Sequence, residues 1–156
     1  MNRASVVFML LVFCLWHDVS AQYRFDSWTT DDGLPQNGIR SITQTPDGYL
    51  WFTTLDGLVR FDGVKFKVFN KGNSPGIISN RFWAIKAFRD GSVWIATEAG
   101  DLSILRDGQF TSYPADQIPG VQIAGFVEDE SGEALIRTNL NYLYLRNGEF
   151  LFAKSL

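Results

Sequence analysis

The feature that most constrains this chain is a short segment that recurs along it. The three copies read DGYLWFTT from residue 47, DGSVWIAT from residue 90 and, in weaker form, GEALIRT from residue 132. Their glycines Gly48, Gly91 and Gly132 lie 43 and 41 residues apart. A repeat of about 40 to 45 residues that holds about four short strands is typical of a β-propeller blade. Because one blade cannot cover both of its own faces, each copy must stack on a neighbour.

Within each copy, the residues predict antiparallel strands joined by tight turns. Residues 49–54 are aromatic, aliphatic or β-branched, which favours a strand covered on both faces. Asp56-Gly57 and Asp62-Gly63 flank the next apolar run, and Asp-Gly favours hairpins because Gly adopts a positive φ easily. The strands that we predict on this basis are residues 39–44, 49–54, 58–62, 65–69, 82–88, 92–97, 101–106, 109–113, 122–128, 133–138, 142–146 and 149–153.

No apolar run has a helical period, so the predicted class is all-β. We predict a partial β-propeller, with about three four-stranded antiparallel blades of an incomplete ring. The predicted parts are an N-terminal strand and loop at residues 22–38, blade 1 at 39–80, blade 2 at 81–120 and a divergent blade 3 at 121–156. The N-terminal strand, with Tyr23, Phe25 and Trp28, would close the ring of a full propeller by completing its last blade. The alternative is an arm that packs on blade 1.

Residues 1–21 are typical of a signal peptide. Arg3 precedes an apolar run from residue 4 to residue 16, and small side chains occupy the cleavage positions before Gln22. A transmembrane helix needs roughly 20 apolar residues, and His17 and Asp18 end this run too early. We therefore expect export to the periplasm, with an uncleaved anchor as the alternative.

Removal of this peptide would restrict the chemistry of the chain. Cys14 and His17 are the only cysteine and the only histidine, so the mature chain would have neither. Thiol nucleophiles, histidine bases, Cys or His metal sites and disulfides are then excluded. We predict no cofactor and no metal, because each Asp that precedes a Gly is explained by turn geometry rather than by calcium. The net charge of −3 is too small to indicate a nucleic-acid partner.

Four strings carry a resemblance to a known family. They are WTTDDGLPQN from residue 28, IRSI from residue 39, DGYLWF from residue 47 and DGLVRFDG from residue 56. Together they resemble the two-component regulator propeller repeat, and the resemblance extends over residues 23 to about 152. The third copy departs from it, because Leu135 replaces the Trp and Ser131-Gly132 and Asn147-Gly148 replace Asp-Gly turns.

The resemblance implies an exported ligand-sensing region of a bacterial hybrid histidine kinase or a related signalling protein. Full-length members continue into more blades, a β-sandwich, a transmembrane helix and a cytoplasmic output module. Since propellers need about four to eight blades, we expect this chain to be a fragment, a truncated product or a module that closes with further blades or another copy of itself. Membrane contact would come only through missing downstream segments. We do not expect an enzyme here, because no Gly-rich phosphate loop is present.

In a propeller, the loops between blades and those between second and third strands share one face. The polar residues that this rule places near that face are Asn37, Arg40, Asn80, Arg81, Trp83, Glu98, Asn139 and Asn141. Because Asn, Arg and Trp hold sugars through hydrogen bonds and stacking, we predict an oligosaccharide or a similar polar ligand. The alternative for the Asn residues is that they cap turns. Trp51 and Trp94 are predicted to lie in the core rather than to form a stacking platform.

Two other functions remain as alternatives. A propeller-based polysaccharide-active enzyme would need paired carboxylates, for which Asp116, Glu128, Asp129 and Glu130 are the candidates. A protein-docking scaffold would use open blade edges. We also expect the isolated chain to fold poorly, because its first and last blades would each leave one apolar face uncovered.

Overall fold

The structure is a computed structural model that describes residues 23–120 and 122–153. The predicted signal peptide, residues 1–21, lies outside the described residues. Within the described ranges, no helix is both long enough and apolar enough to span a bilayer.

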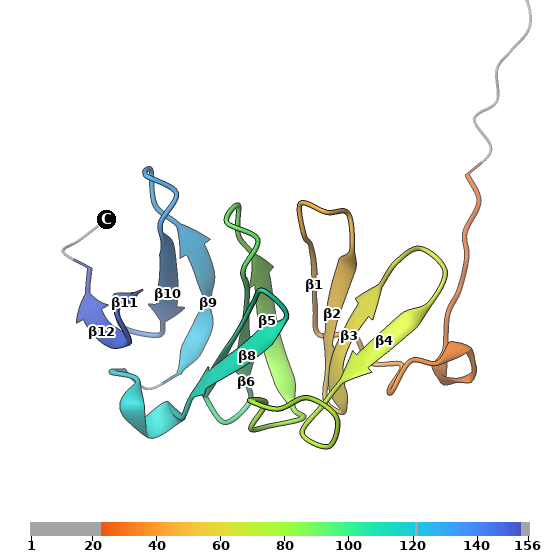
Figure 1. Cartoon of the computed structure of the whole chain (residues 1–156), viewed down its shortest axis with the longest axis horizontal. Coiled ribbons are helices and arrows are strands. Elements are labelled where there is room, and N and C mark those ends of the chain that lie inside the picture. The colour runs from red at the N-terminus through yellow and green to blue at the C-terminus, as the bar shows by residue number, and fades with distance from the viewer. Residues whose placement is uncertain (1–22, 121, 154–156) are drawn as a thin grey trace, which may run out of the picture.

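The described chain folds into three four-stranded antiparallel sheets (Figure 1). The first sheet contains β1 (Ser41–Gln44), β2 (Leu50–Thr54), β3 (Gly57–Phe61) and β4 (Phe66–Phe69). The second contains β5 (Phe82–Ala87), β6 (Val93–Thr97), β7 (Leu102–Arg106) and β8 (Gln109–Tyr113). The third contains β9 (Ile123–Glu128), β10 (Ala134–Thr138), β11 (Tyr142–Arg146) and β12 (Glu149–Phe152). The strands follow one another in sequence order within each sheet, so each sheet is a meander.

The three sheets stand side by side like the blades of a propeller. Strand β1 contacts β5, and β5 contacts β9, so the first strands of the sheets are neighbours. Figure 1 shows the sheets fanning out from this row, and the described residues form no closed ring. The predicted all-β, partial-propeller architecture is therefore confirmed.

The strands lie where the alternation of apolar runs and turns predicted them, and their ends agree with the sequence to within two residues. The turns explain this agreement. Asp107 and Asn147 adopt positive φ values of 49° and 53°, and each is followed by a Gly that also has a positive φ. Two successive positive φ angles define the tight hairpin turn that matches the twist of the flanking strands.

The N-terminal segment differs from the prediction. Residues 23–38 form no strand, and their only regular element is a short 3-10 helix, η1 (Thr30–Asp32). The ring of Trp28 instead packs edge-on against Phe61 and Phe66 of the first sheet, with centroids 5.2 Å and 6.4 Å away. Because a strand forms only beside an edge that can share its hydrogen bonds, and no described sheet pairs with this segment, it packs as an arm. The ring-closing role stays a prediction.

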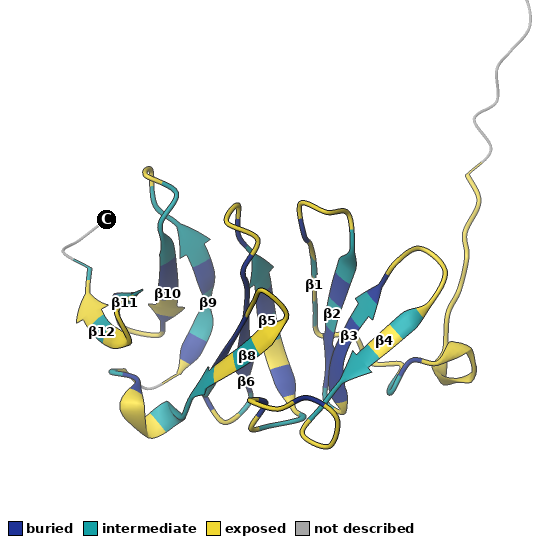
Figure 2. Cartoon of the chain, viewed as in Figure 1, coloured by how far each residue is buried: buried dark blue, intermediate teal, exposed yellow. Residues whose placement is uncertain are grey.

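Two apolar cores lie between the sheets. The core between the first and second sheets includes Trp51, Leu58 and Ile95, and the core between the second and third includes Trp94 and Ile136. Figure 2 shows that exposed residues gather instead in the hairpin tips and the outer strands. Trp51 and Trp94 are only 4% and 5% exposed, which confirms that both belong to the core.

Strand β6 shows why the second sheet needs both neighbours. All five of its residues are buried. Val93 and Ile95 point into the first core, whereas Trp94 and Ala96 point into the second. Successive side chains of a strand alternate between its faces, so a strand without an exposed face requires cover on both sides.

The outward face of the first sheet is covered only in part. Val59 and Phe61 are buried on this face, and Trp28 of the N-terminal arm packs against Phe61. Ile42 of β1, which pairs with Phe52, is 58% exposed. The expected uncovered apolar face is thus limited to the part nearest the innermost strand.

We predict that Trp51→Ala destabilises the fold, because it opens a cavity between two sheets. The expected loss in free energy of unfolding is about 3–5 kcal/mol. Denaturant unfolding measures it, with Trp83→Ala as the control, since Trp83 is 43% exposed and leaves no buried cavity. Equal stability of the two variants would contradict the assignment of Trp51 to the core.

Candidate functional site

The predicted ligand-binding residues lie at one end of the sheets. In Figure 1, the connections from β4 to β5 and from β8 to β9 run along the same end as the turn between β2 and β3. The hairpins β1–β2, β5–β6 and β9–β10 lie at the opposite end. We call the first end the connection face and define it by residues 36–40, 70–83, 98–101 and 139–141.

Arg40 and Trp83 meet on the connection face. The guanidinium carbon of Arg40 lies 5.9 Å from the centre of the Trp83 ring, and the Trp83 residue is 43% exposed. Arg40 directly precedes β1 and Trp83 belongs to β5, so this contact joins the first sheet to the second. Thr53 supports the junction, because its hydroxyl lies 3.5 Å from the carbonyl oxygens of both Ser41 and Trp83. A cation above an indole face is attracted by the ring quadrupole.

Arg81 and Glu98 form a second pair on the same face. The Arg81 Nη2 lies 2.7 Å from the Glu98 Oε2, and the Glu98 N–H donates to the Arg81 carbonyl oxygen over 3.0 Å. The two side chains are 58% and 33% exposed. Such a surface ion pair contributes about 0–1 kcal/mol to stability, so its main effect is to orient the two groups.

A buried residue fixes the positions of both pairs. Phe82 lies between Arg81 and Trp83 in the chain, and it is 1% exposed in the core between the first two sheets. Because Phe82 anchors the start of β5, its two neighbours are held at the surface.

The predicted Asn residues act mainly within their own loops. The Asn37 Oδ1 accepts a hydrogen bond from the Thr30 N–H, and the Asn80 Oδ1 accepts one from the Lys71 N–H, each over 2.8 Å. Asn139 and Asn141 belong to the turn after β10, where their backbone N–H groups donate to the Gln122 carbonyl and the Thr138 hydroxyl. The structure therefore brings Arg40, Trp83, Arg81 and Glu98 together in two pairs and gives Asn37 and Asn80 turn-stabilising contacts.

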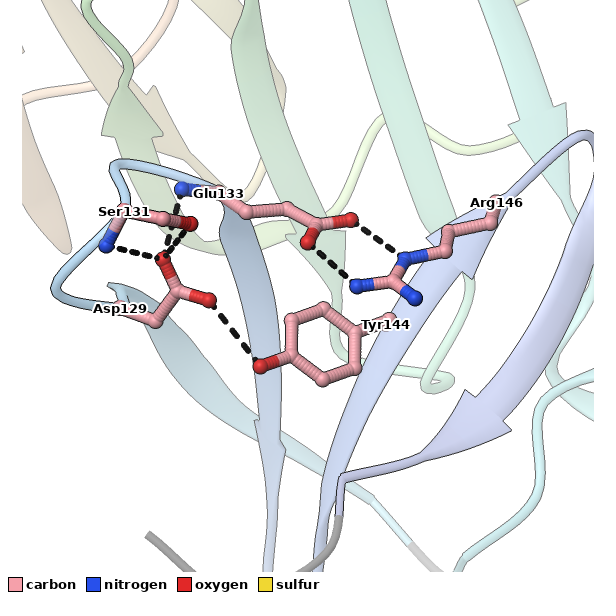
Figure 3. A network of polar contacts seen from close by, with 5 residues as sticks. All are labelled: Asp129, Ser131, Glu133, Tyr144 and Arg146. Carbon is pink, nitrogen blue, oxygen red and sulfur yellow. Dashed lines mark hydrogen bonds and ion pairs between the residues drawn. The ribbon is translucent and has the colours of Figure 1, made fainter.

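Asp129, one of the carboxylates considered for an enzyme, lies away from the connection face in a polar network of the third sheet (Figure 3). The Asp129 Oδ1 accepts hydrogen bonds from the N–H and hydroxyl of Ser131 and from the Glu133 N–H, and its Oδ2 accepts one from the Tyr144 hydroxyl over 3.0 Å. Glu133 forms a two-bond ion pair with Arg146, at 2.6 Å and 2.7 Å. These contacts tie the β9–β10 turn to β11.

The hydrogen bonds of this network shift its acids towards the ionised form. The Ser131 hydroxyl, followed by the Glu133 N–H, lowers the pKa of Asp129 from 3.8 to about 2. The ion pair with Arg146 lowers the pKa of Glu133. An acid catalyst at neutral pH needs a raised pKa, so the network fits a structural role. Glu128 lies 4.0 Å from Arg89, and Asp116 lies in η2 (Ala115–Gln117).

Two of the aspartates that precede glycines, Asp62 and Asp90, hold turns through their carboxylates. The Asp62 Oδ1 accepts from the N–H groups of Val64 and Lys65, and the Asp90 Oδ1 accepts from Ser92. Within the described part of the chain, no group of three or more acidic, His or Cys side chains gathers as a metal site would require.

A pocket of about 540 Å³, which was not predicted from the sequence, lies between the first two sheets at the hairpin end. Arg60 and Lys67 line it. A signal was present, because Arg60 interrupts the otherwise apolar run from residue 58 to residue 61. The pairing of Arg60 with Lys67 on β4 could not be recognised without the strand register.

Comparisons with known proteins agree with this architecture. Residues 33–56 match the family model described as two component regulator propeller. Histidine kinase P4 of Formosa agariphila is 37% identical over 78 residues, which cover 48% of this chain and 6% of that protein. The resemblance to the two-component regulator propeller repeat is thereby confirmed.

Solved structures are similar over most of the chain. The extracellular domain of BT3049 from B. thetaiotaomicron, described as a hybrid two component system, gives a TM-score of 0.68 at 22% identity, over 86% of this chain and 19% of that chain. The extracellular domain of BT4673 from the same organism gives 0.62 at 20% identity, over 83% of this chain and 18% of that chain. These likenesses establish the shared fold. The chain spans less than a fifth of either structure.

We predict that Asp129→Asn changes the acid stability of the protein. Because the folded-state pKa lies below the ordinary 3.8, the ionised carboxylate stabilises the fold above about pH 4, and this contribution is lost as the pH falls towards 2. The variant should melt at a lower temperature at pH 7 and should lose less of its melting temperature between pH 4 and 2. Thermal melts across this range measure both effects, with the exposed Asp116→Asn as the control. Identical pH profiles for all three proteins would contradict the role of Asp129.

Proposed function

We propose that this chain, which carries a two-component regulator propeller repeat, is an extracytoplasmic ligand-sensing region of a two-component signalling protein. Its ligand is a polar molecule such as an oligosaccharide. The repeat at residues 33–56 and the fold shared with extracellular domains of two-component systems support the sensing role. The observation that carries the ligand assignment is the exposed Trp83 beside Arg40 on the connection face.

The chemistry of the connection face suits a sugar. An indole ring offers a flat apolar surface to the C–H face of a pyranose, and a guanidinium offers several N–H donors to its hydroxyls. Glu98 adds a carboxylate acceptor, held beside the Arg81 donors by their ion pair. Arg40, Trp83, Arg81 and Glu98 together present stacking, donor and acceptor groups on one surface.

The position of the site suits a sensor. Arg40 belongs to the first sheet and Trp83 to the second, so a ligand that contacts both would favour one arrangement of the two sheets. Binding can shift a conformational equilibrium only by its difference in affinity for the two states. Phosphoryl transfer would then belong to other parts of the signalling protein, and export would depend on residues 1–21.

Further propeller blades or another copy of the chain are the proposed partners of the first sheet. Ile42 is 58% exposed beside its strand partner Phe52, on the face that points away from the second sheet. An apolar residue in such a position is suited to packing against another sheet.

We predict that Trp83→Ala weakens oligosaccharide binding at least about tenfold and leaves the melting temperature unchanged. The loss follows from removal of the stacking surface, and the fold persists because the side chain is exposed. Calorimetric titration of the full-length protein with a panel of neutral oligosaccharides provides the measurement. Trp28→Ala is the matched control, because Trp28 is 47% exposed but packs on the outward face of the first sheet. Retained affinity in Trp83→Ala, or no binding across the panel, would contradict the proposal.

A further inference from the structure

The pocket between the first two sheets lies at the hairpin end, opposite the connection face. Its volume is about 540 Å³, within the range of small-molecule sites. The wall from the first sheet contains Trp51, Arg60, Lys67 and Phe69. The rim comes from the β1–β2 loop at residues 45–47, the β5–β6 turn at residues 89–91 and the β7–β8 turn at residues 107–108.

Two cations stand directly opposite each other in this wall. Arg60 of β3 and Lys67 of β4 are partners in the strand register, so their side chains extend on the same face of the sheet. Like charges in this arrangement destabilise a sheet. The ion pairs found within residues 23–120 and 122–153 join other groups and include neither Arg60 nor Lys67. Asp62, close in sequence, instead accepts hydrogen bonds from the N–H groups of Val64 and Lys65.

Aromatic rings hold both cations in place. The guanidinium carbon of Arg60 lies 4.2 Å from the centre of the Tyr49 ring and 6.0 Å from that of Trp51. The Lys67 Nζ lies 5.0 Å from the centre of the Phe69 ring. Cation–π contacts orient a charged group without using its N–H donors. The donors of Arg60 and Lys67 therefore stay available to a ligand.

The neighbouring sheet pair provides an internal comparison. A pocket of about 500 Å³ lies between the second and third sheets, lined by Trp94, Ile104 and Thr111 among others. Ile104 and Thr111 are strand partners beside Trp94, as Arg60 and Lys67 are beside Trp51. The repeat architecture thus accounts for both pockets, but it does not account for the cation pair in the first.

We propose that Arg60 and Lys67 form a binding site for an oxyanion, either a carboxylate or a sulfate ester, on a small hydroxylated ligand. An anion between the two side chains would form charge-assisted hydrogen bonds with both and would remove their mutual repulsion. Asp47 and Asp107 on the rim supply carboxylates that accept hydrogen bonds from ligand hydroxyls. This site is separate from the connection face and does not depend on it.

The test uses two acidic probes and their neutral counterparts on the full-length protein. Oligogalacturonate carries carboxylates, and its methyl ester does not. A carrageenan oligosaccharide carries sulfate esters, and its desulfated form does not. We expect at least one acidic probe to bind at least about tenfold more tightly than its neutral counterpart, and the pair that differs identifies the oxyanion. The preferred probe should also raise the melting temperature, because it binds only the folded state.

The matched variant is Arg60→Ile with Lys67→Thr, which gives the first sheet the residues of the second. We expect it to lose the preference for the acidic probe, and to melt without ligand at a temperature no lower than the unaltered protein. If the double variant does not fold, the exposed Lys67→Gln alone should weaken acidic-probe binding at least about tenfold. Lys65→Gln is the control, since Lys65 is an exposed cation of the β3–β4 turn that does not line the pocket.

Three results would each overturn the oxyanion site. They are equal affinity for the acidic and neutral probes, unchanged acidic-probe affinity in the variants of Arg60 and Lys67, and no binding of either acidic probe by the unaltered protein. The two proposals fail independently. Loss of neutral-sugar binding in Trp83→Ala concerns the connection face, whereas the acidic preference concerns Arg60 and Lys67.

Discussion

The structure depends on the burial of sheet faces against neighbouring sheets. Strand β6 has no exposed residue, and its side chains enter one core on each side. A single meander of this kind would leave both of its faces in water, so its stability comes from stacking rather than from strand pairing alone. The buried indole N–H groups are hydrogen-bonded within their own sheets, because Trp51 donates to the Thr45 hydroxyl and Trp94 donates to the Ser92 hydroxyl.

The first and third sheets, at the two ends of the row, differ in the side chains on the faces that no other described sheet covers. On the outward face of the first sheet, Trp28 joins Phe61 and Phe66 in an aromatic cluster that covers apolar surface. The third sheet has the polar network of Asp129, Glu133, Tyr144 and Arg146, shown in Figure 3. Charged groups tolerate water at an exposed surface, so this network occupies its part of the third sheet without an apolar cover.

Local turn chemistry explains how much of the fold was predictable from sequence. A hairpin depends on a few adjacent residues, and pairs such as Asp107-Gly108 and Asn147-Gly148 adopt the positive φ angles that it needs. The N-terminal segment forms no strand in the described chain for the opposite reason. The apolar character of Tyr23, Phe25 and Trp28 favours a strand, but a strand also needs a neighbouring edge, and sequence alone could not show which edge was available.

The same distinction applies to the candidate sites. The loop rule placed Arg40 and Trp83 near the same face, but it could not show that they touch, because that contact depends on how two sheets stack. It also could not separate Asn37 and Asn80, which use their amide oxygens within their loops, from residues directed outwards. The pairing of Arg60 with Lys67 could be recognised only from the register of β3 and β4. A shift of this register by one residue would have abolished the pairing.

The repeated sheets share their architecture but differ in the side chains that line the pockets between them. Stacking similar sheets produces similar pockets between them, as the volumes of about 540 Å³ and about 500 Å³ show. Within such a series, a pocket becomes distinctive only through residues that break the repeat. Arg60 and Lys67 do so where the next sheet has Ile104 and Thr111, at a cost in electrostatic repulsion that an apolar pair would avoid. Because stacking places no demand for charge at these positions, the proposed oxyanion ligand accounts for the departure from the repeat by offsetting this repulsion.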